Sequence, residues 1–341
     1  MRPTVHDIAA AAGVSLATVD RVLNQRPGVR LVTREKVEAA INEIGYIRDV
    51  AAANLAKGRV YPIVFILPTG DNSFMHGLRS EVHQATLRSS FERTEIRILE
   101  VPPFDVSALV AALDALQGQD LAGVALVATD APEVRAAVDR LVSERIPVVT
   151  LVSDLTDSTR HHYAGIDNIA AGRTAARLLG RFLGGQEGDI TVLAGSMLVR
   201  DHRERLEGFS AVMAAEFPRL RLLPVLEGRD DPERARSLVS KALSGSQKII
   251  GVYSLGAGNR GLIAAVKAVR PERELTVVVH ELTQHTRVAL MDGTIDAVLN
   301  QDAGHEVRSA IRVMKAKADG QGVIADQERI RLDIFLKDNL P

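Results

Sequence analysis

The sequence predicts a multi-domain protein in which a small all-α domain precedes a larger α/β domain of two lobes. In the first 46 residues, apolar side chains recur at three- and four-residue spacing, which is typical of short helices. From residue 60 onward, Val- and Ile-rich runs alternate with amphipathic stretches, the pattern of parallel strands covered by helices. The nine runs fit two doubly wound lobes better than one sheet.

Three short helices are expected in the N-terminal domain, at residues 4–12, 16–24 and 33–45. Thr4, Ser15 and Thr33 suit the helix starts, because a hydroxyl oxygen accepts a bond from a free backbone N–H group. Gly13 and Gly45 suit the ends of the first and third helices. The apolar faces of the three helices can then share one small core.

Strands and helices alternate through the rest of the chain. The expected strands are residues 60–67, 95–101, 123–129, 147–152, 189–195, 220–226, 249–255, 275–281 and 295–301. The expected helices are residues 76–90, 106–117, 132–144, 168–184, 202–216, 231–244, 259–269, 284–292 and 303–319.

Composition excludes several classes of protein. The chain has no cysteine, which excludes disulfides, zinc fingers and other thiolate metal sites. The first residues do not have the features of a signal peptide, and no apolar run approaches the roughly 18 residues that a membrane helix needs. We therefore expect a cytoplasmic protein that does not enter the membrane.

Charge is distributed unevenly along the chain. The net charge is −1, but residues 1–60 hold nine Arg and Lys against six Asp and Glu, a net of +3 that leaves −4 for the remainder. Because attraction to phosphate is local, a basic N-terminal domain on an acidic body is compatible with DNA contact by that domain alone.

Residues 4–55 carry the spaced motifs AAGVSxATVxRVLN and VxxxTREKVxxAIxxxGY, and they closely resemble the DNA-binding head and hinge of the lactose-repressor family of bacterial regulators. The segments AGIDNIAAGRTAARLL (164–179) and RERLEGF (203–209) resemble the periplasmic-binding-protein-like (type I) effector domain of that family. The resemblance implies a helix-turn-helix head (1–46), a hinge (47–60) and a two-lobed sensor (61–341). Lobe 1 would comprise about 61–162 plus 302–327, and lobe 2 about 163–301 plus 328–341.

The resemblance also implies which head residues meet DNA. Leu16 and Ala17 would form the specificity pair and Arg21 would read a base, since arginine can grip guanine with two hydrogen bonds. Phosphate or anchoring contacts would come from Thr4, Ser15, Thr18, Asn24 and Tyr46. In the hinge, Ala52 would belong to a helix formed on the operator and Leu55 would wedge into the minor groove. The alternatives are that Leu16 and Ala17 are surface helix formers and that the hinge is a plain linker.

Three positions depart from the family pattern. Asp20 stands where the family usually has serine, and DNA phosphates would repel it unless it pairs with Arg21 or Arg48 or accepts from a cytosine amino group. In the hinge, Arg48 and Asp49 replace the usual Pro-Asn.

Ligands of two-lobed α/β proteins lie at the carboxyl ends of the strands, so the loops there supply candidate effector contacts. In lobe 1 these are Asp71, Asn72 and Phe74 after the first strand, and Asp130 and Asp154 in later loops. By resemblance to the family, Asp71 and Asn72 would bond ligand hydroxyls and Phe74 would stack on a sugar ring. In lobe 2 the resemblance implies Arg205 as the arginine that holds a ligand hydroxyl, Glu281 at the acidic ligand position and Asn259 in a loop of the effector cleft. Gln301 ends the strand that crosses between the lobes. The alternatives are a capped turn at 71–74 and an Arg205 salt bridge to Glu204 or Glu207.

Two motifs resemble those of other kinds of binding site. GAGNRG (256–261) matches the dinucleotide-binding pattern but follows several strands rather than the first, and no catalytic acid–base pair can be placed beside it. HELTQH (280–285) has its histidines five residues apart, which does not suit a zinc site. The sequence therefore predicts no cofactor, no metal and no enzyme activity.

These observations predict a homodimeric transcriptional regulator, most simply a repressor. It would bind near-palindromic operator DNA with an affinity controlled by a sugar or polyol effector. The alternatives are a sugar-binding protein without DNA function and a nucleotide-binding enzyme that uses the 256–261 loop.

Overall fold

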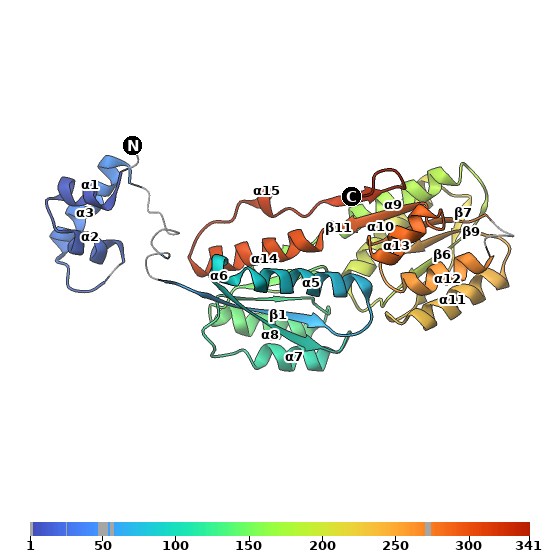
Figure 1. Cartoon of the computed structure of the whole chain (residues 1–341), viewed down its shortest axis with the longest axis horizontal. Helices are drawn as coiled ribbons and strands as arrows, with labels where there is room; N and C mark the ends of the chain where they lie inside the picture. Colours follow the sequence, from blue (N-terminus) through green and yellow to red (C-terminus); the bar gives the residue numbers. More distant parts are fainter. Residues whose placement is uncertain (1–2, 25, 47–53, 55–57, 270–273) are drawn as a thin grey trace. The chain divides into compact units, whose positions relative to one another are not determined.

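The computed structural model of the chain describes residues 3–24, 26–46, 54, 58–269 and 274–341 (Figure 1). The chain forms two compact units, Met1–Arg59 and Val60–Pro341. The first unit contains three helices and the second contains two α/β lobes, which confirms the fold class predicted from the sequence. In the described part of the chain, no helix combines the length and the apolar character needed to cross a bilayer.

The head consists of α1 (Val5–Ala12), α2 (Leu16–Leu23) and α3 (Leu31–Ile44) around the fully buried Ile8, Val19 and Val37. Ser15 caps α2, and Gly13 and Gly45 end α1 and α3 in the left-handed conformation, as expected.

The expectation that Thr33 starts the third helix is wrong. The carbonyl oxygen of Arg30 accepts hydrogen bonds from the backbone N–H groups of Thr33 and Arg34, at 3.0 Å each. Helix α3 therefore already runs through Thr33 and begins at Leu31.

Lobe 1 is built on a parallel five-stranded sheet of order β2-β1-β3-β4-β5. Its strands are β1 (Tyr61–Pro68), β2 (Thr94–Val101), β3 (Gly123–Leu126), β4 (Val148–Leu151) and β5 (His162–Ala164). Its helices are α5 (Ser73–Leu87), α6 (Ser89–Glu92), α7 (Val106–Asp114), α8 (Pro132–Ser143) and α14 (Ala303–Ala318). Helices α5 and α14 cover one face of the sheet and α7 and α8 the other (Figure 1).

Lobe 2 is built on a seven-stranded sheet in which only the edge strand β12 is antiparallel to its neighbour. Its strands are β6 (Gly188–Ala194), β7 (Leu220–Leu222), β8 (Leu226–Glu227), β9 (Ile249–Ser254), β10 (Thr276–His280), β11 (Ala297–Gln301) and β12 (Leu332–Phe335). Its helices are α9 (Asn168–Phe182), α10 (Arg200–Glu216), α11 (Pro232–Gly245), α12 (Asn259–Val269) and α13 (Gln284–Met291). Short helix α15 (Ala325–Glu328) precedes β12.

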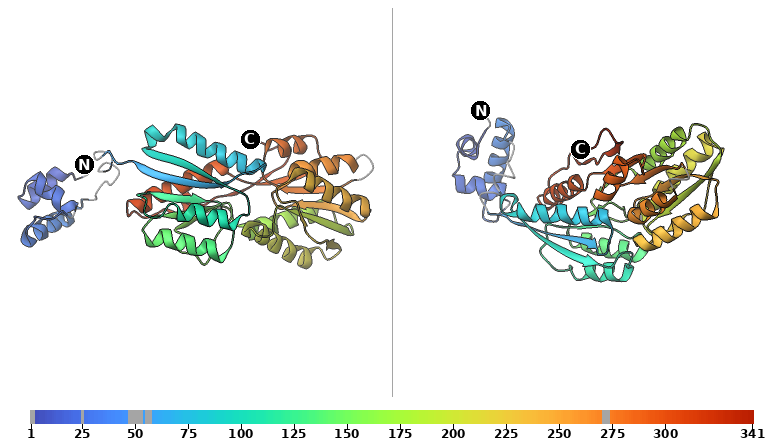
Figure 2. Two further views of the ribbon diagram at one scale, coloured as in Figure 1. Left: turned by 90° about the horizontal axis from the view of Figure 1, so that it is seen from below. Right: turned by 45° about the vertical axis from the view of Figure 1, so that its right-hand side comes forward.

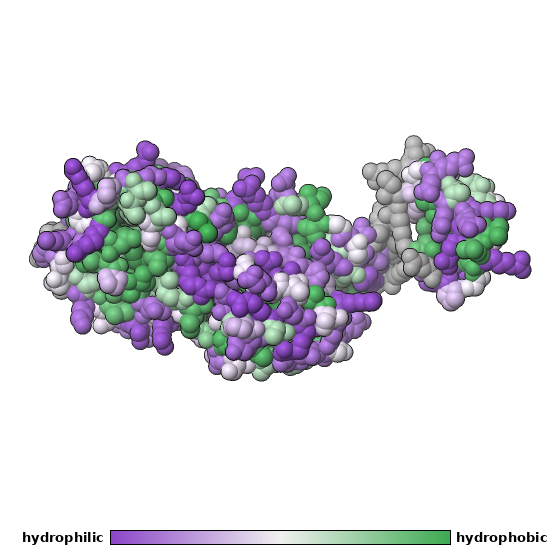
Figure 3. All heavy atoms as spheres, turned by 180° about the vertical axis from the view of Figure 1, so that it is seen from behind, coloured by the Kyte–Doolittle hydropathy of each residue, from purple (hydrophilic) through white to green (hydrophobic). Residues whose placement is uncertain are grey.

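Three connections join the lobes: from β5 to α9, from β11 to α14, and from α14 through α15 to β12 (Figure 2). The apolar side chains of both lobes are mainly internal. Figure 3 shows hydrophilic residues between the apolar patches on the face that it draws.

The strand predictions fail mainly at the edges of the two sheets. β5 and β12 were not expected, and the run 220–226 is two short strands, β7 and β8. Strands at an edge are not buried on both faces, so they lack the continuous apolar run that identifies a central parallel strand.

Helices α9 and α10 pack unusually closely because each has a glycine at the contact. A Cβ on Gly172 would overlap the carbonyl oxygen of Arg205, and a Cβ on Gly208 would overlap that of Ile169. This close approach brings the side chain of Arg205 to Asn168 at the start of α9.

Candidate functional site

Helix α2 presents one face of the head to solvent. Leu16, Ala17 and Arg21 are exposed, whereas Val19 and Val22 are buried in the head core. An exposed helix face of this kind suits the major groove, where the N-terminal residues of a recognition helix meet base edges.

The carboxylate of Asp20 has a different partner from those expected. Its Oδ2 lies 3.2 Å from Nη1 of Arg26, and its Oδ1 accepts a hydrogen bond from Nδ2 of Asn24 at 2.6 Å. The expectation of Arg21 as partner is therefore corrected to Arg26, while Arg48 lies outside the described residues. An internal cation thus offsets part of the charge that Asp20 would bring to DNA.

Several of the expected anchoring residues hold helix ends. Both N and Oγ1 of Thr4 donate to Oδ2 of Asp7, at 2.7 and 2.8 Å, and these bonds lower the pKa of Asp7 below its ordinary value. Oγ of Ser15 accepts from the backbone N of Thr18 at 3.2 Å, and Tyr46 packs against the head core. Their contact with phosphate stays a prediction. The hinge candidates Ala52 and Leu55 lie outside the described residues.

A pocket between the lobes, here called the inner pocket, lies at the carboxyl ends of the strands. Its wall includes Pro68, Pro103 and Phe104 from lobe 1 and Asp201, His202 and Asp230 from lobe 2. This is the position where doubly wound sheets bind ligands.

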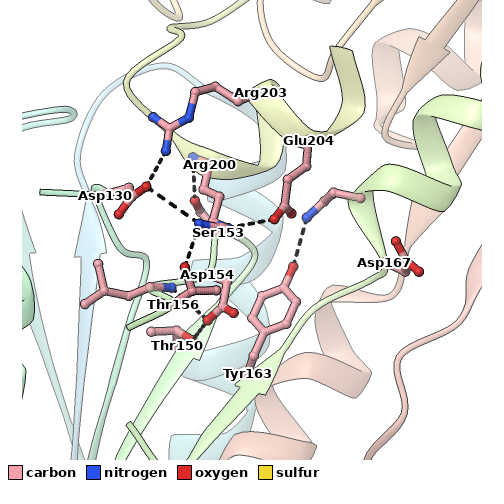
Figure 4. A network of polar contacts seen from close by, with 12 residues as sticks. Asp130, Thr150, Ser153, Asp154, Thr156, Tyr163, Asp167, Arg200, Arg203 and Glu204 are labelled. Carbon is pink, nitrogen blue, oxygen red and sulfur yellow. Dashed lines mark hydrogen bonds and ion pairs between the residues drawn. The ribbon is translucent and has the colours of Figure 1, made fainter. Parts of the chain in front are cut away.

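Arginines of α10 bridge the lobes beside the inner pocket (Figure 4). Nη2 of Arg203 pairs with Oδ2 of Asp130, whose other oxygen pairs with Arg135. The backbone N of Arg200 donates to Oγ of Ser153 at 3.2 Å, and its Nη1 donates to Oγ1 of Thr156 at 2.6 Å. The expected effector residue Asp130 therefore holds the two lobes together.

Two more expected effector residues, Asn72 and Asp71, also make contacts from lobe 1 to lobe 2. Nδ2 of Asn72 donates to Oδ2 of Asp230 at 3.0 Å, and Oδ1 of Asn72 caps α5. Asp71 forms an ion pair with Arg260 at the start of α12, and the hydrogen bond from that guanidinium lowers the pKa of Asp71.

Phe74 and Asp154 contact other residues of lobe 1, and Phe74 also borders a second hollow lined by Asp230 and Asn259 of lobe 2. Phe74 belongs to the apolar core between the sheet, α5 and α14. Both carboxylate oxygens of Asp154 accept from the guanidinium of Arg160, at 2.5 Å each, and Oδ1 also accepts from Thr150 at 2.9 Å. Phe104, rather than Phe74, is the phenylalanine on the wall of the inner pocket.

Arg205 lies at the centre of a buried polar cluster behind the pocket and is 1% exposed. Its Nε donates to Oδ1 of Asn168 at 2.8 Å, its Nη1 donates to the carbonyl oxygen of Leu255 at 2.7 Å, and its Nη2 lies 3.3 Å from Oε1 of Glu281. Nε2 of Gln301 donates to the same Glu281 oxygen at 2.9 Å.

The salt bridges considered for Arg205 from the sequence are therefore corrected. Its acidic partner is Glu281, whereas Glu204 pairs with Arg200 through Nε at 2.6 Å. The partner of Arg205 is therefore a buried residue that is distant in the sequence, and not a glutamate of the same helix.

Burial controls ionisation in this cluster. Desolvation raises the pKa of Glu281, although Arg205 and the bonds from Gln301 act in the opposite direction. It raises the pKa of Glu306 well above the ordinary value, and the charge of Glu281 adds to that effect. It lowers the pKa of His280 well below its ordinary range, so His280 is neutral at pH 7.

The glycine loop 256–261 has a structural explanation. Oδ1 of Asn259 accepts from Oγ of Ser254 at 2.7 Å, and its Nδ2 donates to the carbonyl oxygen of His280 at 2.6 Å, which ties β9 to β10. A Cβ on Gly261 would overlap the carbonyl oxygen of Pro232, so this glycine lets α12 approach α11. A nucleotide is not needed to account for these residues.

The residues of the inner pocket that were not singled out from the sequence include Phe104, Asp201, His202 and Asp230. Helix α10 begins at Arg200, two residues before the expected start, and so places Asp201 and His202 in its first turn. Phe104 and Asp230 follow β2 and β8 in loops where both adopt positive φ, of 62° and 59°. Extending the strand-end rule to these two loops would have found them.

Comparison with known proteins matches both parts of the chain. Residues 4–49 match the family "Bacterial regulatory proteins, lacI family", and residues 63–322 match the family "Periplasmic binding protein domain". The glucose-galactose binding protein GanP from Geobacillus stearothermophilus has the same fold as the sensor, with a TM-score of 0.73 and 19% identity over 83% of this chain and 99% of GanP.

Two curated relatives are regulators. The HTH-type transcriptional regulator DegA of Bacillus subtilis (strain 168) is 26% identical over 62% of this chain and 61% of its own length. The lactose operon repressor of Escherichia coli (strain K12) is 27% identical over 79% of this chain and 71% of its own length. With a lacI-type head and a two-lobed periplasmic-binding-protein domain in one chain, the protein belongs to the lacI family of bacterial regulatory proteins.

Proposed function

We propose that the protein is a transcriptional repressor that binds operator DNA through α2. The observation that carries this proposal is the exposed row of Leu16, Ala17 and Arg21 on a helix of a lacI-type head. Arg21 would read a guanine, while Leu16 and Ala17 offer apolar contact to a thymine methyl group. Ala52 and Leu55 of the hinge would add minor-groove contacts.

The sensor would bind a sugar or polyol in the inner pocket. The pocket combines apolar walls with carboxylates that can accept hydroxyl hydrogen bonds, a combination suited to a hydroxylated ligand. The fold shared with a glucose-galactose binding protein supports the same class of ligand.

A homodimer would join two heads on a near-palindromic operator. Ligand binding would alter the arrangement of the lobes and with it the affinity for DNA. The coupling is reciprocal, so an effector that weakens operator binding is itself bound less tightly by the DNA complex.

The first test is selection of bound duplexes from a random DNA pool by the full-length protein at near-physiological salt. We expect a near-palindrome to be enriched, and Arg21→Ala to lose the enrichment. If the wild-type chain enriches no sequence, the proposal fails and a sugar-binding protein without DNA function becomes the better explanation.

The selected operator then serves to test the sensor. Neutral sugars and polyols are titrated into the protein–operator complex, and we expect one of them to change operator affinity. A ligand that binds the protein without changing operator affinity would contradict the regulatory role.

A further inference from the structure

The charge of the inner pocket is one-sided. Its described lining holds the carboxylates of Asp105, Asp201 and Asp230 together with His202, and it includes no lysine or arginine. Arg229 lines an adjoining hollow and is exposed to solvent. A ligand in the inner pocket therefore meets carboxylates without a neighbouring fixed cation on the wall.

Two of these carboxylates have a buried oxygen without a hydrogen-bond donor among the described residues. They are Oδ1 of Asp201, on a residue that is only 5% exposed, and Oδ1 of Asp230. A buried acceptor without a donor costs free energy, and the cost is greater when the group is charged. The pocket is thus built with acceptor capacity that its own side chains do not use.

His202 does not supply the missing donor to Asp201. Its Nδ1 faces the backbone of Ser196 and lies 2.9 Å from the carbonyl oxygen and 3.4 Å from the nitrogen of that residue. Its Nε2 lies 3.8 Å from Oδ2 of Asp201, beyond hydrogen-bond length, and Oδ2 is not the oxygen that lacks a donor.

The nearby arginines each have an acidic partner, although Nη2 of Arg205 makes no hydrogen bond among the described residues. Arg205 is held by Glu281, Asn168 and the carbonyl of Leu255, Arg203 by Asp130, and Arg260 by Asp71. Burial raises the pKa of Asp230 and the charge of Asp201 adds to the shift, while the hydrogen bond from Asn72 and the charge of His202 act in the opposite direction.

We propose that the effector carries a primary ammonium group on a hydroxylated body, as in an amino sugar, and that Asp201 and Asp230 bind this group. The inference rests on the proposed sugar-binding role of the same pocket. An ammonium group supplies three donors and a positive charge that no lysine or arginine on the described wall supplies, whereas a neutral hydroxyl supplies one donor and no charge. Phe104 and the prolines beside it would face the apolar side of the ring.

The test compares ligands that differ only in charge. Calorimetric titration of the full-length protein uses D-glucosamine, D-glucose and N-acetyl-D-glucosamine, with the corresponding galactose and mannose series, below the pKa of the sugar ammonium group. We expect one amino sugar to bind roughly ten- to hundredfold more tightly than its hydroxyl and N-acetyl counterparts, the range for a hydrogen bond to a charged group.

Variants assign the preference to residues. Asp201→Asn and Asp230→Asn keep side-chain size and remove the charge, so each should lower the preference for the amine about tenfold or more. Glu95→Gln is the matched control, because Glu95 is exposed near the start of β2, at the opposite end of the sheet from the pocket. Thermal melts of each variant establish that it is folded.

Each outcome decides between the two proposals. If a neutral hexose binds as tightly as its amino form, the inference is overturned while the sugar-binding role stands. If no member of any series binds, both are rejected. An amine preference that survives in both aspartate variants overturns the assignment of Asp201 and Asp230.

Discussion

The candidate functional side chains of the head and those behind the inner pocket of the sensor differ in their exposure to solvent. In the head, Leu16, Ala17 and Arg21 are exposed on one helix face. In the sensor, Arg205 and Glu281 are buried and hold each other. Residues that face a large external partner can be identified from their spacing along one helix. The residues around a cleft cannot, because their ion pairs join side chains from distant parts of the chain.

The largest effect is expected from removing the buried charge pair. Arg205→Ala should lower the free energy of unfolding of the sensor by about 3–5 kcal/mol, because it leaves Glu281 buried without its cation. Urea unfolding followed by circular dichroism measures the loss.

The matched control for that variant is Arg177→Ala, which removes an exposed pair with Glu216 across the same two helices, α9 and α10. This pair should contribute less than about 1 kcal/mol. Equal losses for the two variants would mean that burial of the Arg205 pair has no special weight.

A smaller effect is expected from Glu306, which is fully buried and has no hydrogen-bond partner among the described side chains. Its raised pKa means that the folded state holds the proton more tightly than the unfolded state. Stability should therefore be greatest below the ordinary pKa of glutamate and fall as pH rises toward the raised value. Glu306→Gln should flatten this fall in thermal melts recorded across pH, and an unchanged profile would show that another group causes it.

The bridge between the lobes should have a moderate effect. Arg203→Ala removes the pair with Asp130 across the cleft, and because Arg203 is 40% exposed we expect about a fivefold shift toward open lobes. The chain has no cysteine, so spin labels at Glu133→Cys and Lys241→Cys report the distance between lobes without other changes.

Arg140→Ala is the control for that distance measurement, since its partner Asp114 lies within lobe 1. A distance distribution that Arg203→Ala leaves unchanged would indicate that other contacts hold the lobes closed.

The smallest effect is expected in the head. Asp20→Asn removes a carboxylate and releases Arg26, so affinity for non-specific duplex DNA should rise about two- to fivefold at low salt and less at high salt. Fluorescence anisotropy with a random-sequence duplex measures this change, with Asp114→Asn as the control. Weaker binding would instead indicate that Asp20 accepts a hydrogen bond from a base.

The sequence predicted the head and the central strands of both lobes well because their signals are local. Ser15 caps α2 and Gly13 ends α1 through contacts within a few residues, and the buried strands are continuous apolar runs. Edge strands β5 and β12 were missed because they lack that run.

The cleft was predicted only in outline. Its position follows from the strand ends, but the pairing of Arg203 with Asp130 and of Arg205 with Glu281 joins residues more than seventy positions apart. Spacing along the chain does not contain those pairings, and so the residues left to face a ligand, such as Asp201, could not be separated from those that hold the lobes.

The return of α14 to lobe 1 affects how the protein is made. Val307, Ile311 and Met314 complete the core around Phe65 and Val149, although they are synthesised long after β4. Lobe 1 therefore cannot finish folding on the ribosome until most of the chain has emerged, whereas the core of the head is complete once residue 46 has left the exit tunnel. On the proposed function, an interrupted chain would carry a folded DNA-binding head without a complete sensor, so any contact of that fragment with DNA would escape control by the effector.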